Sequence, residues 1–97
     1  MDVNQFHRIA KALADPRRFD ILTAISSADR LCCGKIVEQF SVSQATISHH
    51  LKELVNSGLA QSRRDGQYCY YKLCPEILSD YIAQLEQLIL VSSQLQK

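Results

Sequence analysis

The 97-residue chain lacks several features that mark whole classes of protein. It has three glycines, too few for a loop that wraps its backbone around phosphate groups, and no nucleophile-base-orienter set that would indicate an enzyme. No stretch approaches the roughly 18 apolar residues of a membrane helix, and the first residues contain no apolar signal segment. We therefore expect a cytoplasmic protein that is not an enzyme and has no membrane partner.

Charge and repetition are also uninformative by themselves. The formal net charge is +1, and the chain has no repeat, low-complexity run or linker, so residues 1–97 are predicted to form a single domain. An apolar content of 46% argues against disorder. Between residues 41 and 72 there are four positive and two negative side chains, an excess that permits a local nucleic-acid surface without demonstrating one.

Apolar residues at helical spacing predict three short helices in the first 40 residues, the first over about residues 3–13 and the third over about residues 31–40. Asp15 followed by Pro16 is a capping residue followed by proline at the first helical position, so a second helix should begin there. The predicted apolar face of this second helix consists of Phe19, Leu22, Ala24 and Ile25.

A fourth helix is expected between a serine cap at Ser43 and a glycine stop at Gly58. Its inward stripe is predicted to be Ile47, Leu51, Leu54 and Val55. His50 lies at the edge of this stripe, and we interpret it as a structural residue or a phosphate contact rather than a metal ligand.

Two strands should follow, over residues 59–64 and 67–73, joined by a tight Asp65-Gly66 turn that pairs Arg63 with Tyr68. Alternation along the second strand places Cys69, Tyr71 and Leu73 on its inward face.

The last helix should open at Pro75 and carries an apolar face almost three heptads long. A core helix in a monomer is one interpretation, but this face is more surface than one small subunit covers. We therefore expect a homodimer interface built from this helix with the first helix against it. The face consists of Leu78, Tyr81, Ile82, Leu85, Leu88, Ile89, Ser92 and Leu95.

Opposite the inward stripe, the fourth helix presents polar side chains near its N-terminal half, the part that a helix-turn-helix protein inserts into the major groove of DNA. Two arginines at the hairpin are suited to phosphate or minor-groove contacts. The predicted fold is therefore mainly α, a dimeric winged helix-turn-helix with five helices and a two-stranded wing. The predicted DNA-binding residues are Ser43, Gln44, Thr46, Ser48, His49, Lys52, Arg63 and Arg64. A structural module built on the last helix is the rival class, and it predicts no salt-dependent DNA binding.

Three segments resemble the ArsR/SmtB family of bacterial winged-helix repressors, and with the flanking helices the resemblance covers essentially the whole chain. They are LADPRRFDIL, SVSQATISHHLKELVNSGLA and RRDGQYCYYKL. The resemblance implies a homodimer that occupies a palindromic double-stranded DNA operator and dissociates when an inducer binds. Inducers in the family are often metal or metalloid ions, although some members respond to thiol oxidation or reactive sulfur and some have no known ligand.

The arsenic-sensing branch of this family carries a motif like E-L-C-V-C-D-L, and this chain has R-L-C-C-G-K-I in the matching position. Cys32 matches the first cysteine, while the second cysteine, Cys33, stands one position early. We predict that Cys32 and Cys33 bind a soft ion as inducer, arsenite or antimonite first, with no permanently bound cofactor. A redox or sulfur-responsive thiol pair, or two packing residues, are the alternatives. A zinc site on the last helix is not expected, because that helix has Asp80 and Glu86 but no histidine.

A third thiolate would come from Cys69, from Cys74 or from the partner subunit. Cys69 is interpreted as a small buried residue on the inward face of the hairpin. Cys74 precedes the last helix, whose dipole is expected to lower the pKa of that thiol.

Overall fold

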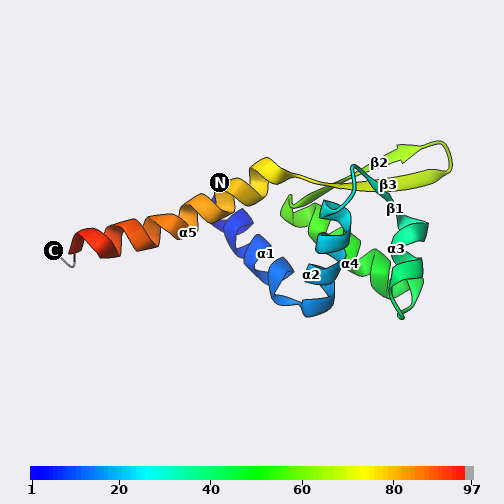
Figure 1. Ribbon diagram of the computed structural model, residues 1–97, viewed down its shortest axis with the longest axis horizontal. Helices are drawn as coiled ribbons and strands as arrows, with labels where there is room; N and C mark the ends of the chain where they lie inside the picture. Colours follow the sequence, from blue (N-terminus) through cyan, green and yellow to red (C-terminus); the bar gives the residue numbers. More distant parts are fainter. Residues whose placement is uncertain (96–97) are drawn as a thin grey trace.

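The computed structural model describes residues 1–95, which form five helices and a small sheet (Figure 1). The elements in chain order are α1 (Val3–Ala14), α2 (Pro16–Ser26), β1 (Leu31–Cys32), α3 (Cys33–Gln39), α4 (Gln44–Ser57), β2 (Ala60–Asp65), β3 (Tyr68–Leu73) and α5 (Pro75–Leu95). The predicted fold class is confirmed. Within residues 1–95, no helix combines the length and the apolar character needed to cross a membrane.

One apolar core joins α1, α2, α3, α4 and the start of β2. Its fully buried residues include Ile9, Ile21, Ile25, Ile36, Ile47, Leu51 and Leu54. On α2 the prediction was wrong for Phe19, which is 50% exposed. Ile21 takes the core position instead, because it shares a helical face with Leu22 and Ile25.

The predicted start of α2 and both predicted ends of α4 are confirmed. Asp15 Oδ1 accepts a hydrogen bond from the Arg18 amide at 3.0 Å, and Ser43 Oγ accepts one from the Thr46 amide at 3.1 Å. Gly58 ends α4 with φ of 90°, the left-handed conformation that glycine adopts without steric cost. These caps satisfy backbone amides and carbonyls that the helices leave unpaired.

The hairpin has a third strand at its edge, so the sheet order is β1-β3-β2, antiparallel throughout. The third helix was predicted to begin near Leu31, which is wrong. Leu31 and Cys32 are extended and pair with Tyr71 and Tyr70, and α3 begins at Cys33. This extended segment packs Leu31 against the core and occupies the free edge of β3.

The hairpin turn lies one residue later than predicted. Asp65 pairs with Tyr68, so the turn residues are Gly66 and Gln67, and Arg63 pairs with Tyr70 rather than with Tyr68. Gly66 takes the first position of the turn with φ of 65°, and tight two-residue hairpin turns require a positive φ at that position. The predicted and observed strand pairings therefore differ by two residues. Because side chains alternate between the two faces of a strand, an even difference leaves every side chain on its predicted face.

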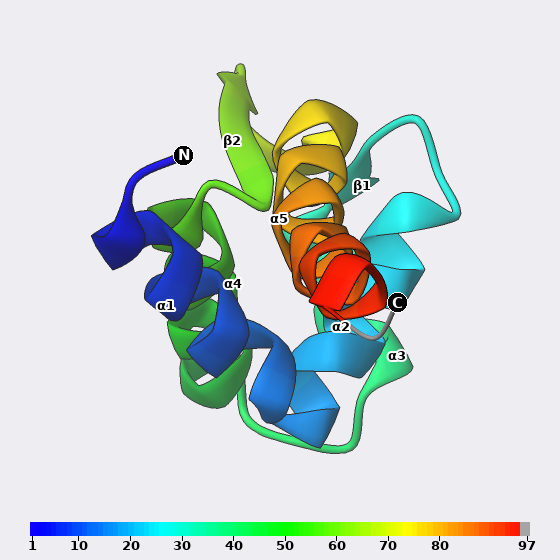
Figure 2. The same ribbon diagram turned by 90° about the vertical axis from the view of Figure 1, so that its left-hand side faces the viewer.

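Helix α5 projects from the domain and gives the molecule a longest extent of 57 Å (Figure 1). Viewed along α5, helices α1 and α4 lie to its left, and α2 and α3 lie below it and to its right (Figure 2). The rings of Phe6 and Tyr81, with centroids 4.8 Å apart, join α1 to α5. No described residue of α5 is buried, and its exposed large apolar residues are Ile82, Leu85, Leu88, Ile89, Leu90, Val91 and Leu95.

Candidate nucleic-acid interface and cysteine cluster

Helices α3 and α4 form the helix-turn-helix, and α4 turns a polar face to solvent. Its inward side is fixed by Ile47, Leu51 and Leu54, each 1% exposed or less. Gln44, Ser48, His49 and Lys52 are exposed on the remaining surface. They are carried by the N-terminal half and middle of a 14-residue helix, which is the arrangement of a major-groove recognition helix.

Two of the predicted contact residues also cap the helix. Ser43 Oγ and Thr46 Oγ1 lie 2.9 Å apart, and Ser43 Oγ also accepts from the Thr46 amide. Ser43 is exposed and Thr46 is half-buried. These hydroxyls therefore hold the first turn of α4 in place, and any contact they make to DNA adds to that role.

The hairpin forms a wing with a basic strand. All residues of β2 after Ala60 are exposed, including Arg63 and Arg64. A hollow of about 300 Å³ lies along this wing, lined by Asp29, Arg30, Gln61, Arg63, Tyr70 and Lys72. Sequence reasoning missed Arg30, which lies just before β1 and reaches Tyr70 and Asp65 of the wing. The short β1 strand brings Arg30 to the wing, and the sequence pattern did not predict that strand.

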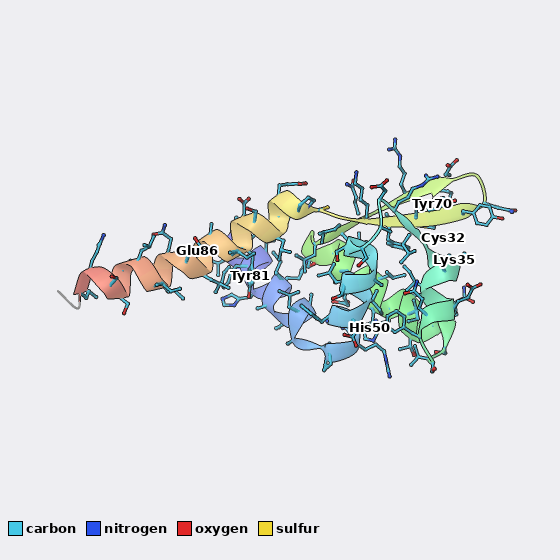
Figure 3. The ribbon with its side chains drawn as sticks, in the orientation of Figure 1. Cys32, Lys35, His50, Tyr70, Tyr81 and Glu86 are labelled. Atoms are coloured by element: carbon cyan, nitrogen blue, oxygen red, sulfur yellow. The ribbon has the colours of Figure 1, made fainter. Side chains whose placement is uncertain are left out.

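His50 joins α4 to α2 (Figure 3). It is 8% exposed, and Arg18 Nε donates to its Nδ1 across 3.4 Å. Burial lowers the pKa of His50. The Asp15 carboxylate partly opposes this shift, and the Arg18 guanidinium adds to it. The neutral imidazole is thus a packing and hydrogen-bonding residue between the two helices, which fits the structural role predicted for it.

The four cysteines are free thiols and all are half-buried. Cys32 pairs with Tyr70 across β1 and β3, and the two lie near one another in Figure 3. Leu31 and Tyr71, the preceding pair, both pack against the core. Because opposed residues share a face and successive residues alternate, Cys32 belongs to the outer face of the sheet.

Cys33 belongs to the inner side. It packs against the core and directly follows Cys32, whose partner Tyr70 is directly preceded by Cys69 on β3. Burial raises the pKa of the Cys33 thiol, with further contributions from Cys69 and then from Cys32. The structure therefore brings Cys33 near Cys69, and the Cys32 thiol acts on Cys33 less strongly than the Cys69 thiol does.

Cys74 corrects a prediction. Burial, followed by the nearby Glu76 carboxylate, raises the pKa of this thiol, whereas the helix dipole had been expected to lower it. Cys74 precedes α5 at the far end of β3 from Cys69. Across the part of the chain that the structure describes, no three histidine, cysteine or acidic side chains form a ready-made metal site.

Five helices, an exposed polar recognition helix and a basic wing define a winged helix-turn-helix DNA-binding protein. Residues 15–62 match the family described as "Bacterial regulatory protein, arsR family". The chain is 39% identical over 94 residues to the arsenical resistance operon repressor of Staphylococcus xylosus, covering 97% of this chain and 88% of that one. It is 37% identical over 76 residues to the transcriptional repressor SdpR of Bacillus subtilis, covering 78% and 83%. The chain belongs to the ArsR family and is a non-enzymatic transcriptional repressor.

Solved structures support the same fold. An ArsR-like transcriptional regulator from Rhodococcus sp. RHA1 superposes with a TM-score of 0.86 at 24% identity, covering 94% of this chain and 85% of that chain. A homodimeric winged helix-turn-helix domain from Mycobacterium bovis, described as a possible ArsR-family regulator, gives 0.73 at 27% identity, covering 91% and 80%. The fold found here is therefore one that a relative uses as a homodimer.

Proposed function

We propose that two copies of this chain form a repressor that binds a palindromic operator and is released when cysteine thiolates bind a thiophilic ion. Trivalent arsenic or antimony is the first candidate, and another soft metal ion is the second. The observation that carries the proposal is the position of Cys32 and Cys33, where β1 ends and α3, the first helix of the helix-turn-helix, begins.

The dimer is supported by the apolar surface of α5. Leu88 and Ile89 are each 69% exposed, and Val3 at the start of α1 is 70% exposed. Fully burying one such side chain stabilises by about 1.5–3 kcal/mol, so a second copy seated along α5 gains substantial free energy. The Mycobacterium bovis domain, a homodimer of the same fold, supports this arrangement.

In the proposed complex each α4 enters a major groove. The Gln44 amide is suited to adenine, and Ser48, His49 and Lys52 reach base edges or phosphates from the same face. Arg63 and Arg64 of the wing, both exposed, supply phosphate or minor-groove contacts beside it. Ser43 and Thr46 hold the first turn and add hydroxyl contacts.

The inducer acts through α3. Thiolates favour soft ions, and the arsenical resistance repressor of Staphylococcus xylosus is 39% identical to this chain. An ion bound by Cys32 and Cys33 displaces the start of α3, which packs against α4 through the core. A coupling of about 1–3 kcal/mol between ion and DNA is enough to change operator affinity by about 5- to 150-fold.

The test begins with selection of double-stranded DNA from a random pool by the purified protein. The selected sites should be palindromic, and affinity should fall steeply between 50 and 200 mM salt, as expected when several phosphates are neutralised. DNA binding by this surface would be contradicted if no site is enriched, or if the affinity does not change with salt concentration.

A second candidate is a thiol-redox or reactive-sulfur switch of the same fold, and the neighbouring Cys33 and Cys69 thiols favour it because thiols that lie close together can form a disulfide. Mass spectrometry of the protein after arsenite, and in parallel after peroxide or polysulfide, separates the two. An arsenic adduct without a disulfide supports the ion. A disulfide or persulfide that releases DNA, with no arsenic adduct, supports the redox switch.

A further inference from the structure

The edge of the sheet brings two thiols from distant parts of the sequence near one another. Leu31 pairs with Tyr71 and Cys32 with Tyr70, and the residues that flank this last pair are Cys33, where α3 begins, and Cys69 of β3. The Cys69 thiol is also the neighbouring group that most strongly raises the pKa of the half-buried Cys33 thiol, as expected for two thiols that lie close together.

The surroundings of the two thiols agree with this proximity. Cys33 and Tyr71 both pack against the core, from α3 and β3 respectively. Burial and an interaction with the Cys69 thiol raise the pKa of Tyr71 to about 12, and Cys33 also contributes. Cys33, Cys69 and Tyr71 thus lie close together in one half-buried site, whereas Cys32 pairs with Tyr70 on the other face of the sheet.

We propose that Cys69 of the wing is a ligand of the inducer ion and that Cys33 and Cys69 form the thiol pair that first captures it. This inference rests on the proposed function and deepens it. Cys32, on the outer face, completes a three-thiolate set only when the start of α3 unwinds. The chemical class of ligand that this thiol pair would take is a trivalent arsenical.

The capture step balances without an oxidant or reductant. Each thiol gives its proton to one hydroxyl of trivalent arsenic, which leaves as water, while one S–As bond replaces each As–O bond. Two thiols therefore release two waters and the arsenic remains trivalent. A peroxide, by contrast, would have to be supplied to oxidise the same pair to a disulfide.

The position of the pair also explains how an ion would affect DNA binding. Cys69 lies on β3 opposite Arg64 of β2, and Cys33 is the first residue of α3. An ion held by both thiolates links the wing directly to the first helix of the helix-turn-helix. The wing and the helix-turn-helix, which contact the same operator half-site in the proposed complex, can then no longer move independently. Their relative position on the DNA therefore changes.

Phenylarsine oxide is a suitable probe because its arsenic takes two thiols. Binding to the full-length protein is measured by the mass of the adduct and by titration of the remaining free thiols. The wild-type protein should form a one-to-one adduct that consumes two thiols. Cys33→Ser and Cys69→Ser should each weaken binding by about 100-fold or more, because each removes one arm of a chelate. Cys32→Ser and the matched control Cys74→Ser should bind like the wild type.

Operator affinity without arsenical checks that Cys69→Ser is folded, and it should match the wild type. If Cys32→Ser loses the adduct and Cys69→Ser keeps it, the inference is overturned while the proposed ion site stands. If the wild-type protein forms no adduct and arsenite does not release its DNA, the proposed function itself fails. If Cys69→Ala, chosen as a second folded variant, binds phenylarsine oxide like the wild type, the inference is also overturned.

Discussion

The guanidinium carbon of Arg30 lies 3.8 Å from the centre of the Tyr70 ring, and Arg30 Nη1 lies 3.4 Å from the Asp65 carboxylate. Arg30 precedes β1, Tyr70 lies in the middle of β3 and Asp65 ends β2. One side chain thus touches both strands of the wing from the segment that leads into the cysteine site. It helps to set where the wing lies relative to α3.

Arg30→Ala should lower the free energy of unfolding by about 1 kcal/mol, because an exposed cation–π contact and an exposed ion pair are each worth about 1 kcal/mol or less. Urea unfolding measures the change. Lys35→Ala is the matched control, since Lys35 forms an exposed ion pair with Glu38 at 3.7 Å, and it should change stability by less than about 0.5 kcal/mol. Equal effects of the two variants would argue against the role of Arg30.

Acid should destabilise the protein through His50. Its pKa in the folded state is below the ordinary value of 6.5, so the unfolded chain takes up a proton first as the pH falls. This contribution to stability is full above pH 6.5 and is lost as the pH falls from there through the folded pKa. Thermal unfolding between pH 7.5 and 5.5 should show it. In His50→Gln the pH dependence should be smaller, whereas His7→Gln, which changes an exposed residue of α1 that does not act on His50, should keep the wild-type slope.

A charge on the apolar face of α5 should break the proposed dimer. Ile89→Glu places a carboxylate on a position that is 69% exposed in one subunit and buried in the proposed dimer. Sedimentation should then show a monomer at concentrations where the wild type is dimeric. Gln87→Glu adds the same side chain on another face of the helix and should leave the dimer intact. Dissociation by both variants, or by neither, would contradict an interface on this face.

Arg64→Ala should weaken DNA binding by a similar factor for all sequences and reduce the salt dependence by about one phosphate per subunit. Gln44→Ala should instead relax preference at one base position, where a bidentate contact gives about 1–3 kcal/mol of discrimination. Binding curves at several salt concentrations, on the selected site and its single-base variants, distinguish the two effects. A Gln44→Ala protein with unchanged preference at every position would show that Gln44 does not read a base.

Features set by local chemistry were predictable from the sequence. Asp15, Ser43 and Gly58 act as caps through contacts within a few residues, and the stripe of α4 follows from helical periodicity alone. These features were enough to predict the five helices, the hairpin and the exposed recognition face.

Features set by distant pairing were not predictable. The two residues of β1 carry no strand pattern and are extended because they bind β3, about 40 positions later. That pairing moves the start of α3 to Cys33, brings Arg30 to the wing and brings Cys33 near Cys69. The hairpin register depended on which residue takes the first turn position, and Gly66 rather than Asp65 takes it.

Release of operator DNA by arsenite is the measurement that tests the account most directly. Fluorescence anisotropy of a selected operator fragment is followed for the wild-type protein and for the Cys32→Ser/Cys33→Ser double variant, with and without arsenite. We predict that arsenite raises the Kd of the wild type by about 5- to 150-fold and leaves the Kd of the double variant unchanged. Release of the double variant at the same arsenite concentration, or a wild-type Kd that saturating arsenite does not change, would contradict it.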